Sequence, residues 1–262
     1  MDQAGSPVLL AIEHAVAIVT LNRPRVLNAI DAELARSFGD AIARIARDGT
    51  VRALLLRGEG RAFCAGGDVA RFLEGDPTAA IEAIIDPLHA ALRDLDALKL
   101  PTVAAVHGPV AGAGFSLAMA CDLCIAAQNS IFTMAYSRIG ASPDGSSTYR
   151  LPRLVVERKA LELAMLAEPV DAAGALALGL VNRVVPDAEL AKEALSLVRR
   201  LAEGPTAAYA RIKHLVGHSL ANDLSTQLDL EREAFLAGTR TTDFREGAEA
   251  FLAKRPARFE GC

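Results

Sequence analysis

Short apolar segments that end in Gly, Pro, Asn or Asp alternate with helical patterns over the first 190 or so residues. Strand-like segments lie at residues 15–24, 51–58, 100–108 and 121–129. The clearest helical pattern lies at 29–50, with Asp31 as the expected N-cap and Gly49 as the expected stop. Because strands joined through helices pair in parallel by right-handed crossovers, we predict an α/β core with a largely parallel sheet.

The last third of the chain lacks strand patterns. Helical patterns occupy residues 187–203, 205–220, 223–238 and 243–255, and Gly204-Pro205 and Gly238-Thr239 separate them. We therefore predict two parts: an α/β core over residues 1–195 that holds the functional site, and a helical region over residues 196–262.

Composition and charge exclude several classes of protein. The formal net charge is −4, so no global excess of bases is present to neutralise nucleic-acid phosphates. The first 19 residues carry two acids and no Lys or Arg, unlike a secretory signal. No apolar run reaches the roughly 18 residues that a membrane span needs. We predict a cytoplasmic protein that binds neither nucleic acid nor membranes.

Two of the four cysteines, Cys121 and Cys124, form a Cys-x-x-Cys pair. This spacing occurs in redox and zinc sites. Here it lies in an apolar run, and no second pair completes a zinc site. We predict buried structural thiols, with no disulfide framework and no metal.

Two glycine-rich loops, each after a predicted buried strand, are the candidate ligand site. They read GRAFCAGGDVARF from residue 60 and GPVAGAGFSLAMACD from residue 108. Neither fits the dinucleotide fingerprint or a phosphate loop. Glycine lets a ligand approach backbone N–H groups, and two loops that donate to one oxygen would form an oxyanion hole. Periodicity does not show whether these loops converge.

At these loops the chain resembles the enoyl-CoA hydratase/isomerase (crotonase) family. The segments that carry the resemblance occur in family order over nearly the whole chain and read TLNRPRVLNAI, GRAFCAGGD, PTVAAVHGPVAGAGFSLAMACD, LGLVNRVVP and REGAEAFLAKR. The resemblance implies a spiral of ββα units whose C-terminal helical region forms trimers, which in some members pair into hexamers. It also implies an acyl-CoA thioester as substrate, with coenzyme A as part of that substrate and no tightly bound cofactor.

The resemblance assigns roles to individual positions. The backbone N–H groups of Gly67 and Ala113 would form the oxyanion hole that polarises the thioester carbonyl. Residues at CoA-binding positions of the family are Arg25, Ala65, Lys254 and Phe259. In the family the last two often reach CoA from a neighbouring subunit.

Two departures from the family pattern bear on the reaction. Family hydratases carry glutamates at positions that hold Ser116 and Tyr136 here, and the resemblance implies that these two residues line the substrate pocket together with His89. Hydration needs one group to activate water and another to deliver a proton, so the loss of both carboxylates argues against a hydratase. Asp144, eight residues after Tyr136, lies at a position that is catalytic in isomerases and dehalogenases of the family. From the residues alone, Pro-Asp-Gly would be a turn.

These features favour an acyl-CoA isomerase in which Asp144 moves a proton while the hole holds an enolate. The resemblance is strongest to the ring-epoxide isomerases of phenylacetate breakdown, through FTMAYSRIG and STQLDLERE. A 4-chlorobenzoyl-CoA dehalogenase-like activity is an alternative, because Tyr136 and His89 match the spacing of its aromatic and histidine; otherwise His89 is a surface residue. Enoyl-CoA hydratase activity on the same scaffold is a further alternative, and a non-catalytic CoA-binding homologue is an alternative of another class.

Overall fold

A mainly parallel six-stranded sheet forms the centre of the computed structural model, which describes residues 5–262. The strand order is β1 (Val8–Glu13), β2 (Val16–Leu21), β3 (Ala53–Gly58), β4 (Thr102–Val106), β6 (Leu123–Ala127) and β9 (Arg183–Val185). Only the β1–β2 pairing in this sheet is antiparallel. The predicted parallel core is therefore confirmed. The prediction that the N-terminus carries no signal includes residues 1–4, which lie outside the described residues.

A second, three-stranded sheet stands beside the first and was not predicted. It pairs β5 (Pro109–Ala111), β7 (Ile131–Thr133) and β8 (Val170–Asp171). Strands of two or three residues are too short to produce a recognisable apolar period. β5 is part of the second glycine-rich loop, so this sheet helps to fix that loop.

Helices cover both faces of the central sheet, because successive side chains of a strand point to opposite faces. Val19 and Leu54 pack with α1 (Ala32–Arg47) and α3 (Pro77–Ala97). Ile18 and Leu55 pack on the other side with α8 (Leu190–Ala202). The side chain of Asp31 accepts the N–H of Leu34 as the predicted N-cap, and α1 ends at Arg47, two residues before Gly49.

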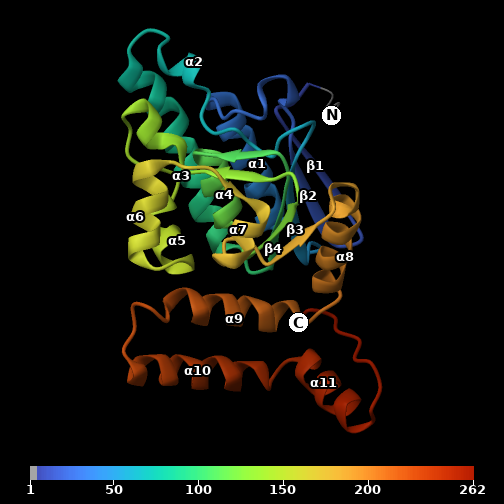
Figure 1. The fold of residues 1–262 in the computed structure, drawn as a ribbon. Helices are drawn as coiled ribbons and strands as arrows, with labels where there is room; N and C mark the ends of the chain where they lie inside the picture. The colour runs from blue at the N-terminus through green and yellow to red at the C-terminus, as the bar shows by residue number, and fades with distance from the viewer. Residues whose placement is uncertain (1–4) are drawn as a thin grey trace.

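The remaining elements lie between the strands and helices of this core or form a C-terminal helical layer. They are η1 (Pro24–Val26), α2 (Val69–Phe72), α4 (Ala113–Ala120), η2 (Ala135–Ile139), α5 (Ser147–Leu154), α6 (Glu157–Leu166), α7 (Ala172–Ala177), η3 (Asp187–Glu189), α9 (Thr206–His218), α10 (Leu224–Gly238) and α11 (Thr242–Leu252). Figure 1 shows α9, α10 and α11 as a layer below the core. Helix α8, which packs on the sheet, runs through the predicted boundary at 195/196, and the division into two parts stays a prediction.

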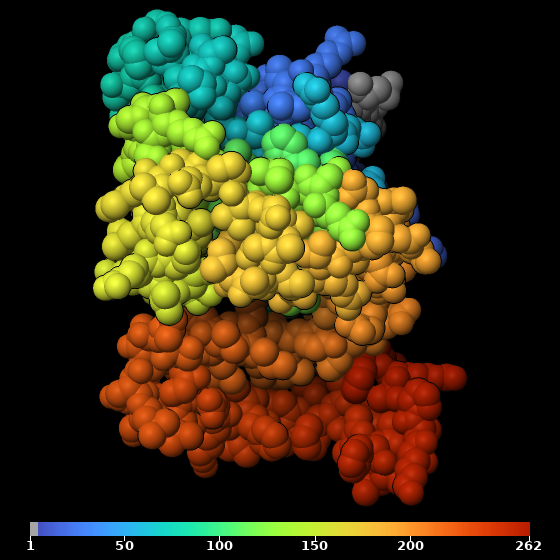
Figure 2. Space-filling view, viewed as in Figure 1, coloured from blue at the N-terminus to red at the C-terminus, as the bar shows by residue number. Residues whose placement is uncertain are grey.

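The C-terminal layer is joined to the core by polar contacts and keeps much apolar surface exposed. Arg52 donates to the carbonyl oxygens of Gly204 (2.6 Å) and Phe259 (3.1 Å), and Lys213 pairs with Asp122 at 3.1 Å. Figure 2 shows this layer along one side of the body. Its large exposed side chains are Ile212, Val216, Leu220, Leu224, Leu228, Phe235, Leu236, Phe244, Phe251 and Leu252. In a single copy of the chain these side chains face water.

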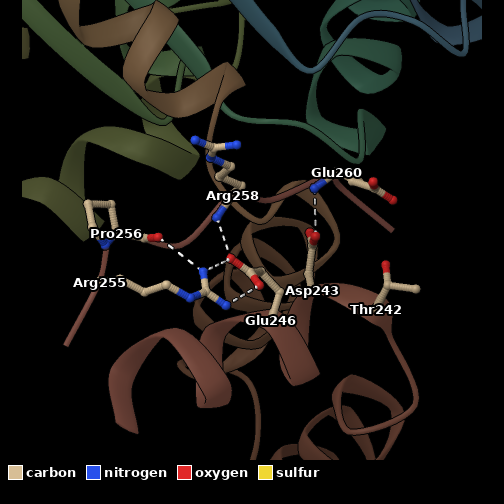
Figure 3. Close-up of a pocket in the computed structure, with 7 residues that line it drawn as sticks. All are labelled: Thr242, Asp243, Glu246, Arg255, Pro256, Arg258 and Glu260. Atoms are coloured by element: carbon tan, nitrogen blue, oxygen red, sulfur yellow. Dashed lines mark hydrogen bonds and ion pairs between the residues drawn. The ribbon is translucent and has the colours of Figure 1, made fainter. Parts of the chain in front are cut away.

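A polar cavity of about 560 Å³ lies where the chain end folds back on α11 (Figure 3). Asp243 accepts the N–H groups of Glu260 (2.7 Å) and Gly261 (2.9 Å). The Arg255 guanidinium, together with the Arg258 N–H, lowers the pKa of Glu246 to about 2. These interactions close the tail against α11, and none of the predicted site residues lines this cavity.

Three of the four cysteine thiols are buried and should be protected from thiol reagents. Cys64, Cys121 and Cys124 are buried and desolvation raises the pKa of each thiol, whereas Cys262 is exposed. A thiol reagent such as DTNB at neutral pH should therefore modify one thiol in the native protein and four after unfolding in guanidinium. Fast modification of more than one thiol in the native protein would contradict this burial.

No helix in residues 5–262 has the length and apolar character to cross a membrane. No group of three His, Cys, Asp or Glu side chains in the same residues is arranged to hold a metal ion.

Candidate active site

The two glycine-rich loops lie side by side, which the sequence pattern alone could not show. Backbone hydrogen bonds join them: Phe63 N–H to the His107 carbonyl (2.8 Å), Cys64 N–H to Pro109 (3.2 Å) and Ala111 N–H to Cys64 (3.0 Å). This ladder runs from the end of β4 to the start of α4. It holds the first loop against β5 and against the N-terminus of α4.

Glycine is required where the loops touch. A Cβ on Gly114 would overlap the carbonyl oxygen of Cys64, and a Cβ on Gly66 would lie 3.1 Å from the Ala111 carbonyl oxygen. Gly66 and Gly112 also have φ values of +108° and +48°, which side chains strongly disfavour. The small residues of both loops therefore allow two backbones to approach closely.

The two backbone groups expected to form the oxyanion hole are both available as donors. Ala113 is the first residue of α4, whose opening N–H groups have no partner within the helix. Among residues 5–262, neither the Gly67 N–H nor the Ala113 N–H donates to another group. A Cβ on Gly67 would overlap the ring of Phe72, so this ring packs directly against the first loop. That the two N–H groups meet at one oxygen stays a prediction.

Asp144 opens a tight turn in front of α5. The N–H of Ser147 donates to the Asp144 carbonyl at 3.2 Å, and the two residues between them, Gly145 and Ser146, have φ values of +63° and +71°. Two successive residues with positive φ are typical of a type I′ turn. The turn expected from Pro-Asp-Gly is therefore present, and it also carries the candidate carboxylate.

Three hydroxyl groups converge on the backbone carbonyl of Asp144. Ser147 Oγ, Ser116 Oγ and Tyr136 Oη donate to it at 2.6, 2.9 and 3.1 Å. Ser116 Oγ also lies 3.1 Å from Tyr136 Oη and 2.5 Å from Ser147 Oγ. We call Ser116, Tyr136 and Ser147 the hydroxyl cluster. It connects α4, η2 and α5 at the residue that carries the candidate carboxylate.

Two members of the hydroxyl cluster, Ser116 and Tyr136, occupy the positions where a hydratase would carry glutamates. Burial raises the pKa of Tyr136 to about 12, so its hydroxyl group stays protonated at neutral pH. Ser116 is 1% exposed, and a Cβ on Gly145 would lie 3.0 Å from the Ser116 Cβ. A longer side chain at position 116 would therefore have to displace the Asp144 turn.

His89 contacts the side chain of Asp144. Its Nε2 lies 2.7 Å from Asp144 Oδ1, and the two side chains are 36% and 27% exposed. One helical face of α3 carries both His89 and Asp96, and Asp96 pairs with Arg150 of α5 at 2.7 Å. His89 is therefore in contact with the candidate carboxylate, and its part in the site stays a prediction.

The candidate CoA-binding residues fall into two groups. Arg25 is exposed in η1, and the neighbouring Leu27 carbonyl accepts the Ala65 N–H at 3.0 Å, so these residues belong to adjoining loops. Lys254 and Phe259 follow α11, which lies at the opposite end of the molecule from α2 in Figure 1. One copy of the chain therefore does not place both groups at one site.

Side-chain contacts from Arg23 and Asn28, two residues outside the predicted site, support the first loop. Arg23 pairs with Asp31 (2.9 Å) and Asp68 (3.3 Å), so Asp68 anchors the first loop to the chain after β2. Asn28 is fully buried, and its side-chain amide donates to the carbonyls of Glu59 and Ala62 (2.9 and 2.8 Å). Arg23 and Asn28 both lie in the segment NRPRVLNA. The asparagine between two apolar residues of this segment is the feature of the sequence that could have indicated a buried polar contact.

Asn28→Ala should destabilise the protein by about 2–4 kcal/mol, because it leaves several buried backbone groups without partners. The matched control is Asn22→Ala, which removes one hydrogen bond, to the Ser6 carbonyl at 3.0 Å, and should cost about 0.5–1.5 kcal/mol. Urea unfolding of both variants measures the difference. Equal losses would show that Asn28 does not hold the loops together.

The paired loops, the N-terminus of α4 and the adjoining carboxylate fit the acyl-CoA-binding class of fold that the sequence resembles, and comparisons with known proteins show the family. The sequence profile described as enoyl-CoA hydratase/isomerase matches residues 11–262, so the chain belongs to that family. A structure titled putative enoyl-CoA hydratase/isomerase from Mycobacterium abscessus superposes with a TM-score of 0.93 at 34% identity, covering 97% of this chain and 100% of that one. The crotonase fold is thereby confirmed.

Two relatives of this chain are named for different reactions. A 1,2-epoxyphenylacetyl-CoA isomerase of Escherichia coli K12 is 40% identical over 97% of this chain and 98% of its own length. A probable enoyl-CoA hydratase of Rhodobacter capsulatus is also 40% identical, over 95% and 96%. The first bears out the resemblance to ring-epoxide isomerases. Because both activities occur at the same identity, the reaction has to be argued from the site.

Proposed function

We propose that the protein is an acyl-CoA isomerase that shifts a double bond or rearranges an unsaturated or ring-bearing acyl-CoA through an enolate. The observation that carries the proposal is the Asp144 site: one carboxylate, contacted by His89 and held through its backbone by the hydroxyl cluster. The positions where two glutamates would support hydration hold a buried serine and a protonated tyrosine instead.

In this reaction each group has a separate task. The N–H groups of Gly67 and Ala113 bind the thioester oxygen and stabilise the negative charge that develops on it. Asp144 takes a proton from the carbon next to the thioester and returns one to a more distant carbon, so the double bond moves. The hydroxyl cluster keeps the backbone of Asp144 fixed between these two transfers.

A panel of thioesters tests the reaction class. Native protein is incubated with 3-hexenoyl-CoA, with ring-bearing phenylacetyl-CoA derivatives and with 2-hexenoyl-CoA, and products are separated by chromatography. We expect isomerised products from members of the first two groups and little hydration of 2-hexenoyl-CoA. Efficient hydration without any isomerisation would overturn the proposal in favour of a hydratase.

A dehalogenase-like activity is a second candidate, and the His89–Asp144 contact favours it. The family resemblance implies that 4-chlorobenzoyl-CoA dehalogenases combine an aspartate with a histidine and an aromatic residue. In this chain Asp144 contacts both His89 and Tyr136. Incubation with 4-chlorobenzoyl-CoA and measurement of released chloride distinguishes this activity from isomerisation.

The C-terminal layer supports a homotrimer or a pair of trimers. Phe251 and Leu252 are 83% and 81% exposed in the single chain, and apolar area of this kind is normally covered by a partner. In such an assembly Lys254 and Phe259 of one copy would bind CoA at the Arg25 and Ala65 loops of another. CoA enters as part of the substrate. A cytoplasmic location stays a prediction.

Light scattering on a size-exclusion column should give a mass three or six times that of the 27.6-kDa chain. The double variant Phe251→Asp, Leu252→Asp should shift the protein toward monomer, because two charges would then lie in the buried contact. Leu73→Asp, at a leucine that is 76% exposed outside the layer, is the control. A native monomer at micromolar concentration would contradict the assembly.

A further inference from the structure

The contact between His89 and Asp144 leaves one imidazole nitrogen unused. Nε2 of His89 lies 2.7 Å from Asp144 Oδ1, while Nδ1 has no partner among residues 5–262. The His89 side chain is 36% exposed, more than that of Asp144 at 27%. Imidazole can accept a proton at one nitrogen while it releases another from the second nitrogen.

The position of His89 is fixed from two sides. Leu88 and Leu92 of α3 are buried in the core on either side of it, and Asp96–Arg150 holds the same helical face to α5. Pro87 lies two residues before His89 and lacks an N–H, so α3 loses one helical hydrogen bond directly before this residue. The imidazole is therefore held beside the carboxylate by packing as well as by its hydrogen bond.

We propose that His89 is a proton relay between Asp144 and solvent, which decides whether the proton that reaches the product comes from the substrate or from water. The inference rests on the proposed isomerase function. Asp144 breaks the C2–H bond and keeps the proton, and the bonding electrons move into the enolate. Once Asp144 is protonated, its O–H faces Nε2 of the tautomer of His89 that is protonated at Nδ1; His89 then accepts that proton at Nε2 and releases its Nδ1 proton to water.

The reverse path brings a solvent proton back. Water protonates Nδ1, Nε2 gives its proton to the Asp144 carboxylate, and Asp144 transfers it to C4 of the enolate as the double bond moves to C2–C3. No atom or electron is gained or lost, and His89 returns to its first state. In this scheme His89 exchanges protons only with Asp144 and water, so it acts through Asp144 as a positioning and relay residue.

The fate of a deuterium label tests the relay. Substrate is 3-hexenoyl-CoA dideuterated at C2, the solvent is ordinary water, and mass spectrometry of the 2-hexenoyl product measures the deuterium at C4. Native protein should give mostly hydrogen at C4. His89→Gln keeps a hydrogen-bond donor but cannot relay, so the fraction of product with deuterium at C4 should rise about fivefold.

Two further variants separate the relay from a structural role. Asp96→Asn loosens the same face of α3 but leaves His89–Asp144 intact, so retention of deuterium should stay at the native level. In His89→Ala, retention should rise as in His89→Gln and fall again when free imidazole is added. If the His89 substitutions acted through packing alone, His89→Gln and His89→Ala would both turn over more slowly, and the fraction of product with deuterium at C4 would stay at the native level.

The outcomes also separate this inference from the proposed function. Equal retention in native protein and His89→Gln, or nearly complete retention in the native protein, would overturn the relay while leaving isomerisation intact. If native protein does not break the C2–deuterium bond at all, the proposed function fails and the relay fails with it.

Discussion

Asp144→Asn is expected to lower kcat for isomerisation by about 10²–10⁴-fold, because the amide cannot take up the substrate proton. Asparagine has nearly the same size, and its side-chain oxygen can still accept a hydrogen bond from His89 Nε2. The backbone carbonyl of residue 144 and the hydroxyl cluster around it remain as they are. We therefore expect KM and the melting temperature to change little.

Steady-state kinetics on the thioesters that the native protein converts measure this effect. Asp96→Asn is the matched control: it breaks the ion pair with Arg150 on the same face of α3 and does not touch Asp144. It should retain activity within about threefold, since an exposed ion pair contributes little. If Asp144→Asn kept full turnover on every accepted thioester, Asp144 would not be the acid/base.

Ala113→Pro should lower kcat/KM by about 10²–10³-fold, because it removes one proposed donor to the thioester oxygen. Proline is tolerated at the first position of a helix, where its missing N–H has no helical partner, and Ala113 holds that position in α4. The change thus deletes the donor at little cost to the helix. Thermal unfolding checks that the fold is kept.

The matched control for this variant is Val69→Pro. Val69 is the first residue of α2, directly after the first glycine-rich loop, and is 46% exposed. The preceding Asp68 has a φ of −76° and a ψ of 86°, which lies outside the α region that proline disfavours in the residue before it. Both variants acquire proline at a helix start near the site, but only one loses a proposed donor. Equal activity in the two would argue against a role for the Ala113 N–H.

The central fold could be predicted because it depends on long periodic segments. The apolar runs that became β2, β3, β4 and β6 are continuous, as expected for parallel strands buried on both faces. β1 was missed because its buried and partly exposed residues follow no clear alternation. The three-stranded sheet was missed because its strands have only two or three residues, too few for a recognisable period, and are held by pairing with one another.

For the candidate site, the sequence predicted the residues but not their contacts. The resemblance selected Ser116, Tyr136, Asp144 and His89, and the structure brings all four together. Ser147 was not selected, although its hydroxyl lies 2.6 Å from the Asp144 carbonyl, because one serine after a Pro-Asp-Gly turn has no distinguishing pattern. Hydrogen bonds between α3, α4 and α5 depend on tertiary packing, which periodicity does not describe.

The structure also changes the meaning of Ser116. From the sequence it was a substrate-pocket residue at the position of a missing glutamate. Its side chain is buried and its hydroxyl lies 2.9 Å from the Asp144 carbonyl, so it supports the carboxylate-bearing turn. The position that lost one carboxylate thus helps to hold another in place.

The most direct test of the account follows the carbon-bound hydrogens of 3-hexenoyl-CoA by proton NMR in heavy water. We predict that native protein replaces hydrogen at C2 or C4 with deuterium while the double bond moves. Asp144→Asn should do neither above the uncatalysed rate. If the native protein binds the thioester, as measured by calorimetry, but neither exchanges these hydrogens nor moves the double bond, the chain is a CoA-binding homologue without this catalysis.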